Sequence, residues 1–283
     1  MRDNQTRLAQ PPAPRAAPPA AQFANQGQHA QTFYSVPTEF VRLPSRGMFY
    51  QEDHPLCGKE EVEIKYMTAK EEDILASEEL LRSGHALDRL LQNLIVNPNI
   101  KASSLLVGDR NAIMLAARIS AYGSDYVASS GCTECGQLTD SFEFNLQKGI
   151  ENTNFIDQKF LRKHDLRFDE ASRNFVVTLP KSQINVGFKM MTGESALIHD
   201  NIDPNSTVTQ TLSRLLISVQ GQTSAGDIRT FVDHMPAADS KFLRKLYIDL
   251  IPNIDLKQEF KCAHCGHVDI KEVPLDAGFF WPE

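Results

Sequence analysis

Apolar residues recur three and four positions apart in two stretches of the chain, and this spacing places them along one face of a helix. The first stretch contains Leu87, Leu90, Leu91 and Leu94. The second contains Leu212, Leu215, Leu216 and Val219, each 125 residues after its counterpart. The pattern predicts two amphipathic helices that resemble each other.

Other segments repeat in the same order, which indicates an internal duplication. The segment Ile64–Thr68 (IKYMT) resembles Phe188–Thr192 (FKMMT) at an offset of 124 residues. Asp109 and Asp239 each open a predicted helix, at an offset of 130 residues. Generic amphipathic helices also resemble one another, but ordered matches with slowly drifting offsets rarely arise by chance. We therefore predict an α+β fold built as a tandem duplication, in which each unit contains a strand, helices and a cysteine-bearing hairpin.

Composition and repeats divide the chain into four predicted segments. Residues 1–32 are rich in Pro, Ala and Gln and hold almost no large apolar side chains, which predicts a disordered arm. The first repeat covers 33–150, a polar linker covers 151–174, and the second repeat covers 175–283. The second repeat ends in an aromatic tail, 277–283, which we expect to pack on the chain's own fold rather than on a partner.

Local signals mark where two of the predicted helices begin and end. Thr68 followed by Glu71 matches the capping box, in which each side chain accepts a hydrogen bond from a free backbone N–H of the first turn. Gly123 suits the end of the helix that Asp109 opens, because glycine tolerates the backbone conformation found there.

Two CxxCG motifs carry the strongest chemical signal in the sequence. Cys132 and Cys135 form one motif, and Cys262 and Cys265 form the other, 130 residues later. Two intervening residues let both sulfurs turn toward one metal, and the following glycine permits the positive φ of such a tight turn. A closed structural zinc site needs four ligands, so we predict that the two knuckles form one zinc-ribbon-like site across a pseudo-twofold axis.

Three other interpretations of these motifs stay open. A redox-active CxxC pair would lie at a helix start, whereas these motifs fall at predicted hairpin tips. A catalytic zinc would need an open coordination position, which four thiolates do not leave, and His264 or His267 would be needed only in place of a thiolate. The two knuckles could also bind separate ions or no ion. Cys57 has no partner in the sequence, and we expect it to be a lone thiol.

Charge and composition narrow the function classes. The chain has 29 basic and 36 acidic residues, a formal net charge of −7 and a pI near 5.6, which argues against binding to duplex DNA. No run approaches the roughly 18 apolar residues of a membrane span, and no apolar signal segment opens the chain. Five cysteines are too few for a secreted disulfide scaffold of 283 residues, which favours a reducing cytoplasm.

The sequence contains no motif that is typical of an enzyme or a nucleotide-binding protein. There is no Walker loop, no GxGxxG after a strand, no GxSxG and no HExxH, and the eight histidines are scattered. We therefore predict a non-enzyme with no catalytic residues and no small-molecule substrate. Because the knuckles lack interleaved basic and aromatic residues, we also expect no nucleic-acid partner.

Four short segments together resemble a known family. They are Leu43-Pro44-Ser45-x-Gly47, Met67-Thr68-Ala69-x-Glu71-Glu72, Leu106-Val107-Gly108-Asp109-Arg110-Asn111 and the CxxCG motif that follows. Over residues 36–283 the chain looks like the baseplate hub and hub assembly proteins of T-even-type contractile-tailed bacteriophages. The resemblance implies a structural subunit or assembly factor of the tail baseplate, assembled in the host cytoplasm and located in the virion. Its partners would be other tail and baseplate proteins, and the resemblance implies no catalytic residues.

Two alternative functions follow from the same observations. The chain could be a tail assembly chaperone that is absent from the finished virion, because an assembly factor binds and then leaves. It could instead be a zinc-ribbon protein associated with nucleic acid, which the acidic charge disfavours. Mass spectrometry of virions and salt-dependent DNA binding separate these alternatives from a retained structural component.

Overall fold

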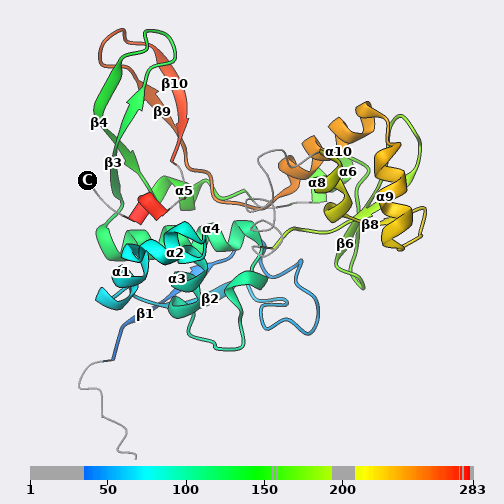
Figure 1. Ribbon diagram of the computed structural model, residues 1–283, viewed down its shortest axis with the longest axis horizontal. Helices are drawn as coiled ribbons and strands as arrows, with labels where there is room; N and C mark the ends of the chain where they lie inside the picture. The colour runs from blue at the N-terminus through cyan, green and yellow to red at the C-terminus, as the bar shows by residue number, and fades with distance from the viewer. Residues whose placement is uncertain are drawn as a thin grey trace, which may run out of the picture. The chain divides into compact units, whose positions relative to one another are not determined.

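The computed structural model is a mixed structure of helices and strands (Figure 1). It describes residues 35–154, 156, 158–192, 208–273, 275 and 277–280. The Pro/Ala/Gln-rich segment 1–32 and the residue Trp281 lie outside the described residues. Within the described part of the chain, no helix combines the length and the apolar character needed to cross a membrane.

The first half of the described chain pairs two strands and then passes through helices into a hairpin. In chain order its elements are β1 (Thr38–Arg42), β2 (Glu61–Lys65), α1 (Ala69–Ala76), α2 (Glu78–Arg82), α3 (Ala86–Leu94), η1 (Ala102–Ser104), α4 (Val107–Tyr122), β3 (Asp125–Gly131), β4 (Leu138–Asn145) and α5 (Gln147–Glu151). The predicted capping box is confirmed at α1, where the Thr68 side chain accepts from the Lys70 N–H and the Glu71 carboxylate accepts from the Thr68 N–H. Gly123 ends α4 with a φ of +86°, as expected.

The second half builds a larger sheet before it reaches its own hairpin. Its elements are α6 (Gln158–Lys163), β5 (Arg167–Asp169), β6 (Asn174–Thr178), β7 (Asn185–Phe188), α8 (Val208–Leu215), β8 (Leu216–Val219), α9 (Ala225–Asp233), α10 (Ala237–Leu250), β9 (Lys257–Lys261), β10 (Val268–Glu272) and η2 (Ala277–Phe280). Strands β5, β6, β7 and β8 form one antiparallel sheet in that order. The segment 151–174, expected as a linker, contains α6 and contributes β5 to this sheet.

One predicted helix extends too far along the sequence. The apolar stripe that begins at Leu212 was expected to continue to Val219, but α8 ends at Leu215 and the next four residues form β8, which pairs with β7. A short apolar run fits a strand as well as a helix, and the β-branched residues Ile217 and Val219 favour the strand. The helical expectation for this run is therefore wrong.

Each half buries an aspartate in the first turn of a long helix. Asp109 of α4 accepts hydrogen bonds from the Ser45 N–H (2.9 Å), the Ser45 hydroxyl (2.5 Å) and the Tyr50 hydroxyl (2.7 Å). Asp239 of α10 accepts from the N–H groups of Lys181 (2.7 Å) and Ser182 (2.9 Å). Neither aspartate is exposed to solvent. The donors lie in the loops after β1 and β6, so each aspartate fixes its helix to the strands of its own half.

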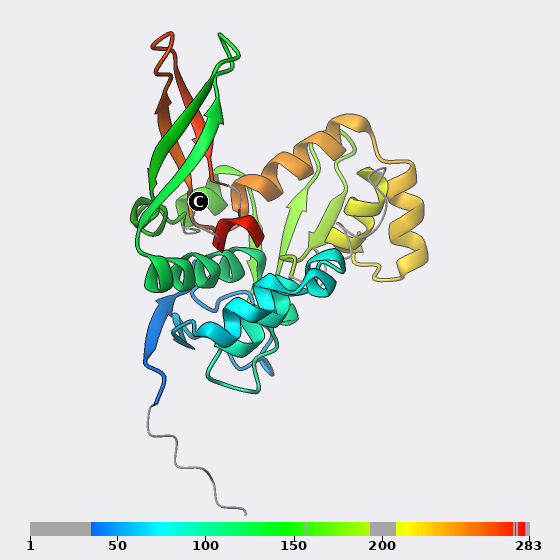
Figure 2. The same cartoon turned by 60° about the vertical axis from the view of Figure 1, so that its left-hand side comes forward.

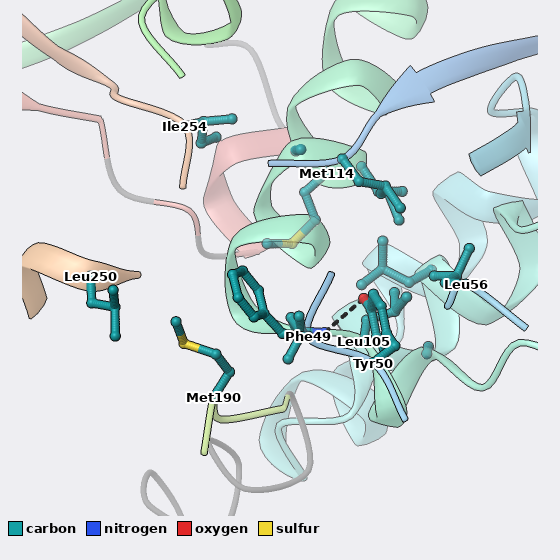
Figure 3. Close-up of a cluster of buried hydrophobic side chains, with 14 of the residues drawn as sticks. Phe49, Tyr50, Leu56, Leu105, Met114, Met190, Leu250 and Ile254 are labelled. Atoms are coloured by element: carbon teal, nitrogen blue, oxygen red, sulfur yellow. Dashed lines mark hydrogen bonds between the residues drawn. The ribbon is translucent and has the colours of Figure 1, made fainter. Parts of the chain in front are cut away.

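One cluster of buried apolar side chains includes residues of both halves. Figure 3 shows Phe49 from the first half and Met190 from the second within this cluster. Phe279 and Phe280 of η2 are fully buried in it, and the Arg118 Nε donates to the Phe279 carbonyl at 3.1 Å. The expected packing of the aromatic tail on its own fold is therefore confirmed for these two phenylalanines.

Candidate metal centre

Two antiparallel hairpins, β3–β4 and β9–β10, carry the four cysteines of the CxxCG motifs. The last strand pairs before the tips are Gly131 with Leu138 and Lys261 with Val268, so each motif lies in the turn between two strands. Figure 1 and Figure 2 both show the hairpins side by side, with their tips at the same end. The predicted placement of the motifs at hairpin tips is confirmed.

The two tips have the same backbone geometry. In the first, the Gly136 N–H donates to the Cys132 carbonyl at 3.1 Å, and in the second the Gly266 N–H donates to the Cys262 carbonyl at 3.0 Å. The two glycines have φ values of +69° and +72°. A side chain at either position would strain this backbone conformation, which accounts for the glycine after each second cysteine.

The four cysteine sulfurs converge on one point between the tips. The Sγ atoms of Cys132, Cys135, Cys262 and Cys265 all lie within 4.8 Å of one another. The Sγ atoms of Cys132 and Cys265 are 3.6 Å apart, and those of Cys135 and Cys262 are 3.7 Å apart. Four sulfurs placed tetrahedrally at a zinc–sulfur distance of about 2.3 Å would be about 3.8 Å apart. The arrangement is therefore compatible with a single metal ion such as zinc, bound by all four of the predicted residues.

Backbone N–H groups lie close to the sulfurs of the two buried cysteines. The N–H of Glu134 lies 3.4 Å from the Cys132 Sγ, and the N–H of His264 lies 3.4 Å from the Cys262 Sγ. Hydrogen bonds from the N–H groups of Cys265 and His264 lower the pKa of the Cys262 thiol to about 6. A thiol with a lowered pKa is deprotonated at neutral pH. Burial and hydrogen bonds with neighbouring sulfurs raise the pKa of the Cys265 thiol to about 12 and also raise the pKa of Cys135. A bound metal cation would displace the protons of these two thiols.

Hydrogen bonds and one aromatic contact join the hairpins away from the sulfurs. The Gln258 Nε2 donates to the Asn145 carbonyl at 2.8 Å, and the Asn145 N–H donates to the Gln258 Oε1 at 3.2 Å. The rings of Phe142 and Phe260 meet edge to face, with centroids 5.0 Å apart. These pairs could not be predicted from the sequence, because nothing local in either segment indicates which residues face each other across more than a hundred positions.

Further contacts cross between the tips themselves. The Thr133 hydroxyl donates to the Asp269 carboxylate at 3.1 Å, and a ring nitrogen of His264 lies 3.1 Å from the Leu138 carbonyl. His264 therefore contacts the opposite hairpin, and the cluster that could hold an ion contains the four cysteines and no histidine. Within the described residues, no second group of three or more His, Cys, Asp or Glu side chains is arranged to hold a metal.

The hairpins have only a small apolar core of their own. Cys132, Phe260 and Cys262 are buried together, with Phe142 packed against them. The apolar side chains at the start of β4 and in β10 face outward instead, and Leu138 and Ile270 are each 60% exposed. With so little burial, the cross-hairpin bonds and a bound metal ion would supply most of what holds the two hairpins together.

Comparison with known families identifies the family of the chain. Residues 49–281 match the family described as T4 bacteriophage base plate protein, a range that contains both knuckles. The search of curated proteins and the search of solved structures returned no match. The matched range covers most of the chain, so the chain belongs to this family of phage baseplate proteins. Membership implies a location in the tail of the virion and contacts with other baseplate proteins.

Proposed function

We propose that this chain is a non-enzymatic structural or assembly component of the hub region of a contractile-tail baseplate, acting through contacts with other tail proteins. The observation that carries the proposal is the family match over residues 49–281. The hub position rests on the resemblance of segments such as Leu106–Asn111 to hub proteins. Asp109 in that segment is a buried anchor of α4, so its role in this chain is structural.

In this proposal the four cysteines hold one structural zinc ion. Four thiolates complete a tetrahedral shell, so the ion has no open position at which a substrate could bind. The sulfur separations of 3.6 and 3.7 Å support one shared ion over two separate ions. Since Cys132 and Cys262 belong to different halves, the ion ties the ends of both halves together, and its binding free energy adds to the stability of the fold.

We further infer that the two halves are a tandem duplication. In each half a buried aspartate of a long helix holds the loop that follows a strand, and a CxxCG hairpin follows that helix. In each half, the residue that follows a shorter helix also pairs with the strand before that helix: β2 precedes α3, and β7 precedes α8. These pairs are Ile95 with Ile64 and Leu216 with Phe188.

These strand pairs change the alignment of the shorter helices. If Ile95 and Leu216 are equivalent, the offset between the two helices is 121 residues, and Leu91 aligns with Leu212. The helical spacing in the sequence gives an offset of 125 residues instead. One face of a helix repeats with every turn, so periodicity does not distinguish two alignments that differ by one turn.

The proposed function is tested by complementing a phage that lacks this gene. The wild-type chain is expected to restore infectious tails, and Cys132→Ser and Cys262→Ser are expected to restore them poorly, with Cys57→Ser as the matched control. Normal infectious tails in the absence of the protein would contradict an essential assembly role. Mass spectrometry of purified virions then separates a retained component from a chaperone, because only a retained component yields its peptides.

A further inference from the structure

Strand β1 has an open edge. Among the described residues it pairs only with β2. The Tyr66 N–H donates to the Pro37 carbonyl and the Leu43 N–H donates to the Glu60 carbonyl, so the odd-numbered residues of this segment form the hydrogen bonds to β2. In an antiparallel pair the N–H and C=O groups of the alternate residues then point away from the partner strand. These are the groups of Thr38, Phe40 and Arg42.

A cavity of about 530 Å³ lies beside this edge. Its wall on α4 contains Ala112, Ala116 and Ile119, which lie on one face of the helix, and α5 adds Ile150. Small alanine side chains leave room between the helix and the edge of the strand. A cavity of this size, lined largely by apolar side chains, can accept a branched aliphatic side chain with volume to spare.

The charged groups around the cavity do not balance. Glu39, Glu61 and Glu151 line it, and Arg42 is the one basic residue among the described lining residues. The Oε1 atom of Glu39 is buried and has no hydrogen-bond partner within the described part of the chain. A buried carboxylate oxygen without a donor is unfavourable, so an occupant that brings a cationic donor to Glu39 would relieve that cost.

The other face of the same strand carries one exposed apolar side chain, Phe40, between Thr38 and Arg42. Side chains alternate between the two faces of a strand, and Val41 is 7% exposed whereas Phe40 is 68% exposed. An added strand would therefore place one row of its side chains toward the cavity and the other row beside Phe40.

We propose that the open edge of β1 accepts an extended segment of another baseplate protein as a third strand. The segment would place an aliphatic side chain in the cavity and a lysine or arginine against Glu39. Main-chain hydrogen bonds to the even-numbered residues of β1 would supply affinity, and the two side chains would supply specificity. The proposal deepens the proposed function, on which it rests, by naming the surface that makes one of the contacts.

A second copy of this chain fits the edge less well. In both copies the backbone N–H and C=O groups that point outward belong to even-numbered residues. Antiparallel pairing of two β1 strands would therefore place even-numbered residues opposite even-numbered ones, and odd-numbered residues opposite odd-numbered ones. Glu39 would then face an odd-numbered residue such as Val41 or another Glu39, and none of residues 37, 39, 41 and 43 is basic. Self-pairing leaves the buried carboxylate oxygen without a cation.

Photocrosslinking identifies the occupant. A benzophenone amino acid replaces Phe40 in the full chain, the phage is grown and irradiated, and the crosslinked peptide is sequenced by mass spectrometry. The expected product is a single segment of another tail protein that carries an aliphatic residue and a lysine or arginine two positions apart. A crosslink to residues 1–34 of this chain, a crosslink to a second copy, or no crosslink would each overturn the proposal.

Substitutions at the edge test whether the contact matters. Phe40→Pro removes an outward N–H and keeps the hydrogen bonds to β2, and Glu39→Lys repels the expected cation. Each is expected to lower incorporation into baseplates by at least about tenfold, with unchanged zinc content and circular dichroism. Ile248→Asp is the matched control, because Ile248 on α10 is 71% exposed, like Phe40, and lies outside the cavity lining.

The outcomes separate this proposal from the proposed function. If loss of the whole gene abolishes tails but both edge variants are incorporated normally while folded, the docking site is wrong and the baseplate role stands. If loss of the gene leaves tails infectious, the baseplate role itself fails.

Discussion

The two halves of this chain anchor their long helices with the same kind of residue but with different donors. Asp109 accepts one backbone N–H and two hydroxyl groups, whereas Asp239 accepts two backbone N–H groups. A hydroxyl can rotate to donate or accept, but a backbone N–H can only donate. The first anchor can therefore adapt to a changed partner, whereas the second requires an acceptor at both oxygens.

At the cysteine hairpins, in contrast to the aspartate anchors, the two halves supply equivalent groups. Each tip supplies one buried and one exposed cysteine, and each buried sulfur is near a backbone N–H at 3.4 Å. If one ion is shared, equivalent substitutions in the two halves should have equal effects at the hairpins and unequal effects at the aspartates.

The largest effect is expected from loss of a thiolate. Cys132→Ser and Cys262→Ser each remove one of four ligands, so both are expected to reduce zinc from about one ion per chain to near zero. Metal analysis of the purified proteins measures this directly. Hydrogen exchange is expected to show faster opening of both hairpins in either variant, with the core around Phe280 still protected.

Cys57→Ser is the matched control for these variants. Cys57 is a half-buried free cysteine outside the cluster of four, and its substitution is expected to leave zinc content unchanged. Two zinc ions per wild-type chain, or full occupancy in one of the two ligand variants, would contradict a shared site.

The next largest effect is expected at the aspartates, where the halves should differ. An asparagine at position 239 can accept a hydrogen bond from only one of the Lys181 and Ser182 N–H groups, and its NH2 group faces the other N–H. Asp239→Asn is therefore expected to lower the free energy of unfolding by about 3 kcal/mol. At position 109 the asparagine NH2 can donate to the hydroxyl of Ser45 or Tyr50, so Asp109→Asn is expected to cost about 1 kcal/mol.

Urea unfolding of both variants beside the wild type measures this difference. If the free energy of unfolding falls with urea concentration at the same slope in all three proteins, the unfolding transition itself is unchanged. Equal losses in the two variants would mean that the identity of the donors does not decide the tolerance of each anchor.

Local features of this fold could be predicted from the sequence. The Thr68 and Glu71 cap and the turns around Gly136 and Gly266 depend on neighbouring residues, so short motifs were sufficient to predict them. The meeting of the four cysteines was predicted from the repeat and from the ligand number of zinc, which together left one arrangement that completes the site.

Other features depend on residues far apart in the chain and could not be predicted. Asp109 and Asp239 were recognised as helix starts, but their donors lie 64 and about 58 residues earlier, in loops whose position only the fold determines. The apolar run of β8 is too short to show a period, so the sequence does not distinguish a strand from a helix there. Pairing with β7 decides its conformation.

A smaller contrast is expected at the serines of the two anchor loops. The Ser45 hydroxyl donates to Asp109 and accepts from the Gly47 N–H, so Ser45→Ala is expected to cost about 1 kcal/mol. The Ser182 hydroxyl is buried without a hydrogen-bond partner among the described residues, so Ser182→Ala is expected to change the free energy of unfolding by about 0 kcal/mol. Thermal and urea unfolding check the pair, and a larger loss in Ser182→Ala than in Ser45→Ala would contradict the expected order.

The smallest expected effect is a pH dependence at the first anchor. Burial raises the pKa of Asp109 above its ordinary value of 3.8, and the hydrogen bonds from Ser45 and Tyr50 oppose this only in part. The folded chain therefore binds a proton at Asp109 more tightly than the unfolded chain does. Its free energy of unfolding falls as the pH rises from 3.8 through the folded-state pKa of this group.

Comparison with Asp109→Asn isolates this contribution, because the variant lacks the titrating carboxyl. The stability advantage of the wild type over Asp109→Asn is expected to shrink as the pH rises through that window and to stay constant above it. The difference in free energy of unfolding between the wild type and Ser182→Ala is measured in parallel at equal metal content. It is expected not to change with pH, because that substitution removes no titrating group. If the advantage over Asp109→Asn grows with pH instead, the hydrogen bonds from the two hydroxyls and the Ser45 N–H outweigh burial, and the carboxylate is the favoured form of this anchor.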